Sequence, residues 1–490
     1  MNKRSGISLP MWAWCLLAAG IALGTYILVL SIFGLSGFPL DDAWIHQTYA
    51  RSLARTGQWA YWTGQVSAGS TTPLWTVLLI PGQLIPKGLM AWAYLLGWLG
   101  LAASAWLGQK AYENLTGQSR LGLPIMALFL CFEWHLVWAA GSGMETILAG
   151  LVVLAVFEQL SREKPLYWLA GGLAGLAVWI RPDGVTLLGP ILFVILFSKE
   201  KWSNRARQAG WVMLGFLILF LPYLVFNKSL AGTYWPNTYY AKQMEYAILN
   251  KEALPVRFFR LMIQPMVGAG ILLLPGAFWA FYLGFRRRRP TWMALGLFWI
   301  GFTLLYAWRL PVAYQHGRYL MPAMPTYFLL GFLGMNELVG SFGQQPSARL
   351  FRFGWQLAVT LTLLLFFFNG AMAISNDVGI IQTEMVATAR WIQQNTPPNA
   401  LVAAHDIGAL GYYGERQLVD LAGLISPEVA PIIRDEEKLK AYLDERGVDY
   451  LVTFPGWYSS LTDGKLVLFQ TDGKYSPAQG GENMAVYQWR

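Results

Sequence analysis

The sequence has 490 residues, of which 55% are hydrophobic and 13% are charged, with a mean hydropathy of +0.40. Because soluble domains carry about 25% charged residues, this composition excludes a soluble enzyme, a disordered chain and a fibrous repeat, and it predicts an integral membrane protein. The net charge of +9 is unevenly distributed, since residues 376–490 hold 9 Lys and Arg against 15 Asp and Glu. The excess of basic residues therefore lies in residues 1–375. In a membrane protein such an excess is explained by the positive-inside rule, under which cytoplasmic loops are basic, rather than by nucleic-acid binding.

Eleven apolar segments approach or exceed the length of about 20 residues that a crossing helix needs. The first follows Lys3 and Arg4 and ends in no small-residue cleavage pattern, so we expect a retained helix rather than a signal peptide. In chain order the segments are 11–34, 89–108, 121–140, 144–160, 166–180, 184–198, 209–227, 261–285, 291–309, 319–339 and 355–375.

A further apolar stretch, 73–86, is short for a crossing, and Pro81 lies inside it. If it does not cross, the basic residues of the other loops fall on the side of the N-terminus, which satisfies the positive-inside rule. These residues are Lys110, Arg120, Arg162, Lys164, the cluster 199–207, the run 286–289, Arg349 and Arg352. We therefore expect 73–86 to be an interfacial helix in the first outer loop, 35–88, with a cytoplasmic N-terminus and an extracytoplasmic C-terminus.

The pattern changes after residue 375. Helices are predicted at 384–395 and 436–446, and strands at 400–404, 417–420, 450–454, 465–470 and 484–489. This alternation predicts a small extracytoplasmic α/β domain over 376–490. The expected fold class is thus an all-α polytopic membrane domain over 1–375, with about eleven transmembrane helices plus interfacial helices, followed by this domain.

Two adjacent carboxylates, Asp41 and Asp42, stand just outside the first crossing. Paired acids beside a membrane are costly unless they bind a metal, a cation or a substrate. If 41–55 is helical, Asp42 shares one face with His46. The alternative is that one Asp caps the helix, which leaves the other unexplained.

Further polar residues lie in other segments of the same outer side. Ser70, Thr71 and Thr72 before Pro73 are typical of a capped helix start, whereas Glu145 is either a cap or a site residue. Arg181 and Asp183 are further candidates, although they could simply pair with each other. Asn237, Tyr240 and Lys242 lie in an aromatic-rich loop. His316 and Arg318 lie at a span boundary, where the arginine side chain could extend to the lipid headgroups or hold a phosphate. His405 and Asp406 are interpreted as a satisfied pair at a strand end.

The layout resembles the GT-C superfamily of integral membrane glycosyltransferases. The resemblance rests on the motif Asp41-Asp42-Ala43-Trp44-Ile45, the stretch 67–75, Arg181-Pro182-Asp183-Gly184 and the stretch 236–242. The sequence is similar to bacterial members, namely the mycobacterial terminal arabinofuranosyltransferase type and, more distantly, the aminoarabinose and protein mannosyl transferases.

This resemblance implies a polyprenyl-phosphate sugar donor, inverting transfer, and an envelope glycan, lipid or protein as acceptor. We assign the departing phosphate to Arg318, helped by Lys242 or Arg181, and the general base to Asp41 or Asp42. Glu145 matches a second acid of the aminoarabinose type. His46, Asp183, Asn237, Tyr240 and His316 complete the expected substrate-binding set. The sequence leaves open a divalent cation, Mg²⁺ or Mn²⁺, on Asp41, Asp42 and Glu145.

Two other classes of function remain as alternatives. A polytopic transporter or lipid flippase would also have many helices, but it places ionisable groups near the midplane and often shows inverted repeats. The acids of this sequence stand at the outer ends of the helices, and no repeat is visible. The second alternative is a non-catalytic envelope-assembly subunit, whose function would survive loss of both Asp41 and Asp42.

Overall fold

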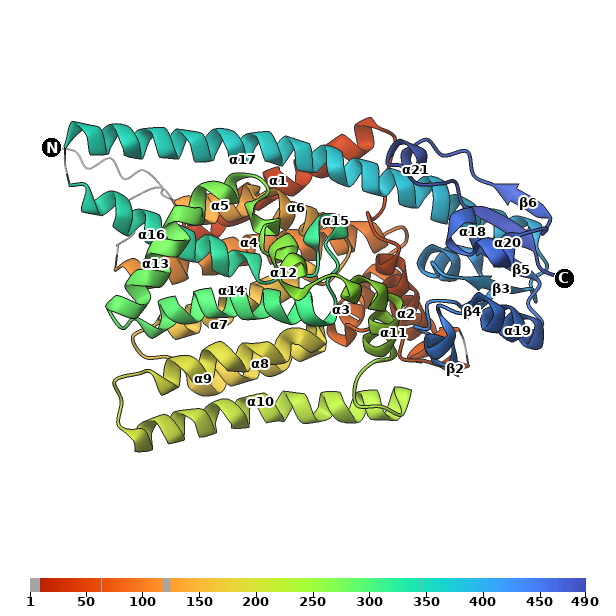
Figure 1. Cartoon of the computed structure of the whole chain (residues 1–490), viewed down its shortest axis with the longest axis horizontal. Helices are drawn as coiled ribbons and strands as arrows, with labels where there is room; N and C mark the ends of the chain where they lie inside the picture. Colours follow the sequence, from red (N-terminus) through yellow and green to blue (C-terminus); the bar gives the residue numbers. More distant parts are fainter. Residues whose placement is uncertain (1–8, 63, 118–123, 344) are drawn as a thin grey trace.

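The computed structural model describes residues 9–62, 64–117, 124–343 and 345–490. Lys3, Arg4 and Arg120, which contribute to the expected topology, lie outside these ranges. Helices make up most of residues 9–395 (Figure 1). They are α1 Met11–Ile32, α2 Asp42–Thr56, α3 Pro73–Leu84, α4 Leu89–Thr116, α5 Ile125–Phe132, α6 Trp134–Gly141, α7 Thr146–Ser161, α8 Tyr167–Ile180, α9 Leu188–Leu196, α10 Trp202–Ala231, α11 Asn237–Glu245, α12 Leu254–Met262, α13 Leu274–Arg286, α14 Pro290–Arg309, α15 Tyr314–Gly317, α16 Met324–Ser341 and α17 Pro346–Ile380.

Within the described ranges, six helical segments are long and apolar enough to cross a membrane. They are Met11–Ile32, Leu89–Thr116, Trp202–Ala231, Ala269–Arg286, Pro290–Arg309 and Pro346–Asn395. Other predicted crossings correspond to shorter apolar helices, among them α7 and α8. The prediction of a polytopic helical membrane protein is confirmed, and the helix expected at 73–86 is α3.

Two predicted crossings are wrong as single helices. Residues 121–123 of the segment 121–140 lie outside the described ranges. The described remainder is divided, because Glu133 has an extended backbone and its carboxylate accepts a hydrogen bond from the Leu136 amide at 3.1 Å, which caps α6. The segment 261–285 begins with the last turn of α12 and continues through short 3-10 turns before α13. Pro265 and Gly268, the latter with φ of 110°, separate these pieces.

Small residues let the helices approach closely. A Cβ atom at Gly171 of α8 would collide with the carbonyl of Val212, and one at Gly215 of α10 would collide with the carbonyl of Trp168. Contacts of this kind are typical of helices that associate in a membrane, where close packing replaces the hydrophobic effect. They fix α8 against α10 along the edge of the bundle seen in Figure 1.

The long helices run along one axis, and the two ends of the bundle differ. In Figure 1 the adjoining ends of α9 and α10, of α13 and α14, and of α16 and α17 lie at the left, and the C-terminal sheet lies at the right. The left end carries the basic runs 199–207 and 286–289 together with Arg349 and Arg352. This distribution agrees with the positive-inside argument. The orientation of the chain in a membrane stays a prediction.

The C-terminal part contains a five-stranded mixed sheet in the order β4-β3-β5-β7-β6. β3 is parallel to β4 and β5, whereas β7 is antiparallel to β5 and β6. The five predicted strands are confirmed, with helices around them: β3 Leu401–Ala404, β4 Gln417–Asp420, β5 Tyr450–Thr453, β6 Val467–Gln470, β7 Ala485–Gln488, α18 Ala387–Asn395, α19 Glu436–Arg446, α20 Ser459–Thr462 and α21 Tyr475–Ala478. A hairpin of β1 Ala60–Trp62 and β2 Gln65–Val66 lies in the first loop.

The sheet is joined to the bundle both covalently and by contacts. α17 continues through a π-helical turn into α18, so that one helix spans Pro346–Asn395. On the other side, Arg51 of α2 donates hydrogen bonds to the carbonyls of Gly411 and Tyr412 at 2.9 and 2.6 Å. These two attachments hold the sheet above α2, the helix that begins at Asp42.

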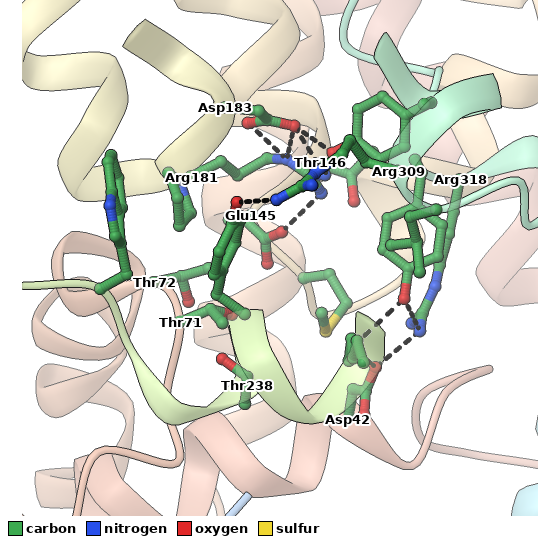
Figure 2. Close-up of a pocket in the computed structure, with 18 of the residues that line it drawn as sticks. Asp42, Thr71, Thr72, Glu145, Thr146, Arg181, Asp183, Thr238, Arg309 and Arg318 are labelled. Atoms are coloured by element: carbon green, nitrogen blue, oxygen red, sulfur yellow. Dashed lines mark hydrogen bonds and ion pairs between the residues drawn. The ribbon is translucent and has the colours of Figure 1, made fainter. Parts of the chain in front are cut away.

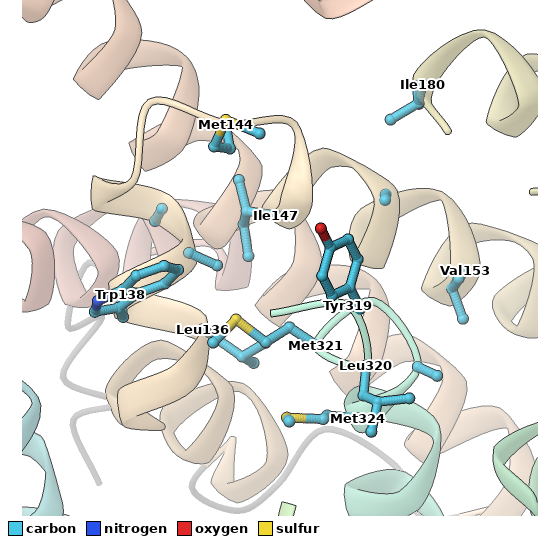
Figure 3. Close-up of a cluster of buried hydrophobic side chains, with 14 of the residues drawn as sticks. Leu136, Trp138, Met144, Ile147, Val153, Ile180, Tyr319, Leu320, Met321 and Met324 are labelled. Atoms are coloured by element: carbon cyan, nitrogen blue, oxygen red, sulfur yellow. The ribbon is translucent and has the colours of Figure 1, made fainter. Parts of the chain in front are cut away.

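An apolar cluster supports the end of the bundle that faces the sheet. Tyr319, Leu320, Met321 and Met324 pack there against side chains of α6 and α7, including Ile147 (Figure 3). Leu320 and Met324 are fully buried. Because Tyr319 belongs to this cluster, the residue before it, Arg318, has a backbone fixed by close packing.

Candidate functional site

A cavity of about 330 Å³ opens at this end of the bundle. Figure 2 shows two charged clusters on its walls, one around Asp42 and the other around Arg181. The walls come from α2, α11, α14, the segment between α8 and α9, and the segments before α3, α7 and α16. The charged lining residues are Asp42, Glu145, Arg181, Asp183, Lys242, Arg309 and Arg318.

The first cluster surrounds Asp42, the first residue of α2. Its Oδ2 atom lies 2.7 Å from Nη2 of Arg318 and 3.4 Å from Nζ of Lys242. Burial alone would raise the pKa of Asp42, but the charges of Lys242 and Arg318 outweigh it and hold this pKa below its usual range. Asp42 is therefore ionised, and two cations compensate its charge.

Arg318 uses only part of its hydrogen-bonding capacity. Its Nη2 atom donates to Asp42 and, at 3.1 Å, to the hydroxyl of Tyr319. Within the described ranges, its Nε and Nη1 atoms are buried without a hydrogen-bond partner. A guanidinium with unpartnered N–H groups at a cavity wall can bind an oxyanion, because leaving buried donors unpaired is costly.

The second cluster surrounds Arg181, which follows α8. Its Nη1 atom donates to Glu145 at 3.1 Å, and its Nη2 atom donates to Asp183 at 3.0 Å and to the hydroxyl of Tyr306 at 2.8 Å. Nε also contacts Asp183, at 3.2 Å. Arg181 and Asp183 thus form the ion pair that the sequence offered as one alternative. Glu145, at the start of α7, forms a second ion pair with Arg181. Oε2 of Glu145 is buried without a hydrogen-bond partner in the structure as described.

His46 links α2 to the start of α3. Its Nδ1 atom lies 3.1 Å from the hydroxyl of Ser70 and 3.2 Å from that of Thr72. Thr72 occupies the N-cap position, as the sequence predicted, but its side chain makes no capping hydrogen bond. The hydroxyls before Pro73 therefore orient His46 at the cavity wall instead of closing the helix.

Asp41 has a different environment from that of its neighbour. Its carboxylate accepts hydrogen bonds from the backbone N–H groups of Gly408 and Ala409, at 2.6 and 2.8 Å, and makes no capping bond to α2. Burial and the nearby charge of Asp406 raise the pKa of Asp41 to about 8. Asp41 thus attaches the C-terminal part to the bundle, whereas Asp42 faces Arg318.

A second, larger cavity of about 980 Å³ lies between the bundle and the C-terminal sheet. Both Asp41 and Asp42 line it. It shares five lining residues with the smaller cavity, namely Asp42, Ile45, Lys242, Arg318 and Leu424. The carboxylate of Asp42 therefore stands at the boundary between the two cavities.

Three predicted site residues lie apart from Asp42. Asn237 begins α11 and Tyr240 is 43% exposed, and neither lines the two cavities. His316 binds Asp377 through Nε2 at 2.8 Å and packs against Trp138. Gln315 and His316 both have positive φ, which turns the chain sharply just before Arg318.

Other cavity residues were not predicted from the sequence. Tyr319 contacts both Arg318 and Lys242, and Tyr306 contacts both Arg181 and Asp183. Glu245 follows Lys242 by one helical turn, a spacing that could have indicated it. Tyr306 lies within an apolar segment that resembles any other crossing, so no local pattern distinguishes it.

The three carboxylates named as a possible metal site do not converge. Asp41 binds backbone amides, Asp42 binds Arg318, and Glu145 binds Arg181. Across the described ranges, no group of three His, Cys, Asp or Glu side chains is placed to hold a metal ion. The residues present do not fit a divalent cation, and we assign it no step.

Comparisons with known proteins agree with this architecture. A family model described as a domain of unknown function, DUF8728, matches residues 376–487, and no curated protein matches the sequence. Among solved structures, ArnT from Cupriavidus metallidurans bound to undecaprenyl phosphate is 13% identical, with a TM-score of 0.60 and 98% of each chain covered. The archaeal oligosaccharyltransferase AglB from Archaeoglobus fulgidus, in complex with an inhibitory peptide and a dolichol-phosphate, is 12% identical, with a TM-score of 0.59, 90% of this chain and 69% of AglB covered. The chain therefore shares its fold with these two proteins, as the resemblance predicted.

Proposed function

We propose that this chain is an integral membrane glycosyltransferase that moves a sugar from a polyprenyl-phosphate donor to an acceptor hydroxyl, with inversion at the anomeric carbon. The observation that carries the proposal is the placement of the Asp42 carboxylate 2.7 Å from Arg318, whose Nε and Nη1 atoms have no hydrogen-bond partner among the residues that the structure describes. Such a site provides a proton acceptor beside a phosphate binder. The lipid phosphates bound to ArnT and AglB, which share the fold, support this class of donor.

The smaller cavity suits the lipid phosphate. Four cationic side chains line it, against three carboxylates, and the rest of its surface is mostly apolar. The cations are Arg181, Lys242, Arg309 and Arg318. A phosphate there would lie beside Arg318 and Lys242, while the apolar surface would contact the first prenyl units.

The chemistry follows from the position of Asp42. When a phosphate takes Arg318 and Lys242 as partners, Asp42 loses the charges that lower its pKa, and it becomes a stronger base. The acceptor oxygen then attacks the anomeric carbon and its proton passes to Asp42. The bond from that carbon to the phosphate oxygen breaks, and the phosphate leaves with the electron pair, stabilised by Arg318 and Lys242. A phosphate is a weak base, so this step needs no strong general acid.

Release of polyprenyl phosphate tests the proposal directly. The purified chain in lipid nanodiscs is incubated with a panel of polyprenyl-phosphate monosaccharides, and the released lipid phosphate is measured by mass spectrometry. We expect wild type to consume at least one donor, and Asp42→Asn to lower the rate by about 10²–10⁴-fold, the usual contribution of a general base.

A matched control is Glu252→Gln, since Glu252 pairs with Arg260 in an exposed position and lines neither cavity. Its rate should equal that of wild type. The proposal fails if no donor in the panel is consumed, or if Asp42→Asn retains the wild-type rate while its thermal unfolding is unchanged.

A further inference from the structure

The larger cavity differs in character from the smaller one. It lies between α2, α11 and α17 on one side and the C-terminal sheet on the other. Its volume of about 980 Å³ is at the upper end of the range for small-molecule sites, about 300–1,000 Å³. Seven carboxylates line it, against three Lys and Arg side chains. This balance disfavours an anionic ligand such as a phosphorylated lipid.

Most of these carboxylates already have partners. Three of them accept hydrogen bonds from backbone N–H groups: Asp41 from Gly408 and Ala409, Glu436 from Ser460, and Glu482 from Gly456. The other three contact side chains: Asp42 binds Arg318, Asp377 binds His316, and Glu245 binds His405. A site for a polycationic peptide would present several uncompensated carboxylates. Here one carboxylate oxygen, Oδ2 of Asp406, is buried without a hydrogen-bond partner within the described ranges.

The cations of this cavity either lie at its boundary or have a partner. Lys242 and Arg318 stand at the boundary with the smaller cavity, where the proposed donor phosphate binds. Arg434 donates to the backbone carbonyl of Glu245. The wall beyond Asp42 therefore offers compensated charges and polar groups, and it is suited to a neutral ligand that carries many hydroxyl groups.

An aromatic side chain completes this wall. Trp457 lines the cavity and is 49% exposed. Its ring is held by His405 and Phe454, with ring centroids 5.1 Å away in both cases. His405 is fixed in turn, since its Nδ1 atom lies 2.8 Å from the hydroxyl of Tyr458. A half-exposed indole held in place can pack against the apolar face of a sugar ring.

We propose that this larger cavity binds the acceptor, and that the acceptor is a neutral glycan. The inference rests on the proposed function, because Asp42 at the cavity boundary is the base that receives the proton of the glycan hydroxyl. Trp457 stacks on a sugar ring of the acceptor, and Asp406 accepts a hydrogen bond from one of its hydroxyl groups. The C-terminal part thereby contributes residues that select the acceptor.

The test measures binding without any donor. The full-length chain in nanodiscs is titrated with neutral oligomers of glucose, mannose, galactose, arabinose and N-acetylglucosamine, and saturation-transfer NMR follows the sugar protons. A uronic-acid oligomer, a lysine-rich peptide and an anionic phospholipid serve as competitors. We expect one neutral class to bind, and Trp457→Ala to weaken this binding at least about tenfold, as loss of a central aromatic contact does.

Two further variants decide between binding and loss of structure. Trp457→Phe keeps a ring and should recover most of the binding. Leu466→Ala changes a residue that is 61% exposed and lines neither cavity, and it should bind like wild type. The inference is overturned if no neutral oligomer binds, if the acidic oligomer, the peptide or the lipid displaces the glycan as the preferred ligand, or if Trp457→Ala binds normally.

The outcomes separate this inference from the proposed function. Asp42-dependent donor release without binding of any neutral glycan would end the inference and leave the glycosyltransferase proposal standing. Trp457-dependent glycan binding without consumption of any donor would end the glycosyltransferase proposal and leave a glycan-binding cavity.

Discussion

Two largely buried arginines line the same cavity, and their surroundings differ. The side chain of Arg181 is 11% exposed and that of Arg318 is 9% exposed. Arg181 donates through all three of its nitrogen atoms, to Glu145, Asp183 and Tyr306. Among the described residues, Arg318 donates through Nη2, and its other two nitrogen atoms have no hydrogen-bond partner. Similar exposure therefore goes with different surroundings. Arg181 holds neighbouring segments together, whereas Arg318 has the two unpartnered nitrogen atoms on which the phosphate proposal rests.

The largest expected effect concerns Arg318. Arg318→Met removes the proposed phosphate contact, and we expect donor turnover to fall about 10²–10³-fold, the usual effect of losing one transition-state donor. Thermal unfolding should change little, since Asp42 keeps Lys242 as a partner and is 25% exposed. Steady-state release of polyprenyl phosphate measures the first quantity, and scanning fluorimetry in nanodiscs measures the second. Wild-type turnover by Arg318→Met would show that the comparison is mistaken.

The reverse pattern is expected at Arg181. Arg181→Met leaves Glu145 and Asp183 buried near each other without a cation, which costs about 3–5 kcal/mol of stability. The unfolding temperature should fall clearly below that of Arg318→Met, measured under the same conditions. Lys242→Met is a useful third variant, because it removes a partly buried cation, 21% exposed, from the other cluster. If Arg181→Met and Arg318→Met unfold at the same temperature, the two arginines do not differ as described.

A smaller effect is expected from Asp41. Asp41→Asn places a side-chain NH₂ group or a single acceptor where Gly408 and Ala409 both donate, which costs about 1–3 kcal/mol. We expect faster hydrogen exchange at Gly408 and Ala409 than in wild type, and faster proteolysis of the C-terminal part. Asp463→Asn, an exposed change in the same part, is the control. Unchanged exchange at these two amides would show that Asp41 does not attach the C-terminal part.

A pH dependence is also expected at the same contact. Burial raises the pKa of Asp41 to about 8 and that of Asp406 to about 6, and the charge of Asp406 adds to the first shift. Both groups keep their protons in the folded chain at pH values where the unfolded chain has lost them. The free energy of unfolding should therefore fall as pH rises from about 4 to about 8. Asp406→Asn removes one of these groups, so the free energy of unfolding should fall less steeply with pH in this variant than in wild type. Thermal unfolding at several pH values measures both slopes, and equal slopes for the two proteins would contradict the prediction.

Much of the fold could be predicted from local sequence. Apolar runs located the helices, and strand patterns located all five strands of the C-terminal sheet, because both depend on the spacing of apolar residues. The helix break at Glu133 was missed, since a single acid inside an apolar run does not show where its side chain will bind. The hydroxyls before Pro73 were predicted as caps, and they bind His46 instead.

The sequence by itself determined the membrane fold and the loops that carry the candidate residues. It also raised the pairing of Arg181 with Asp183, which are two positions apart, as one of two alternatives. Only the tertiary structure decided which of two adjacent carboxylates faces Arg318, a residue 276 positions later in the chain. Successive helical residues point about 100° apart, so Asp41 and Asp42 separate into different environments. Which environment each enters depends on how the C-terminal sheet packs over α2, and no local pattern encodes that contact.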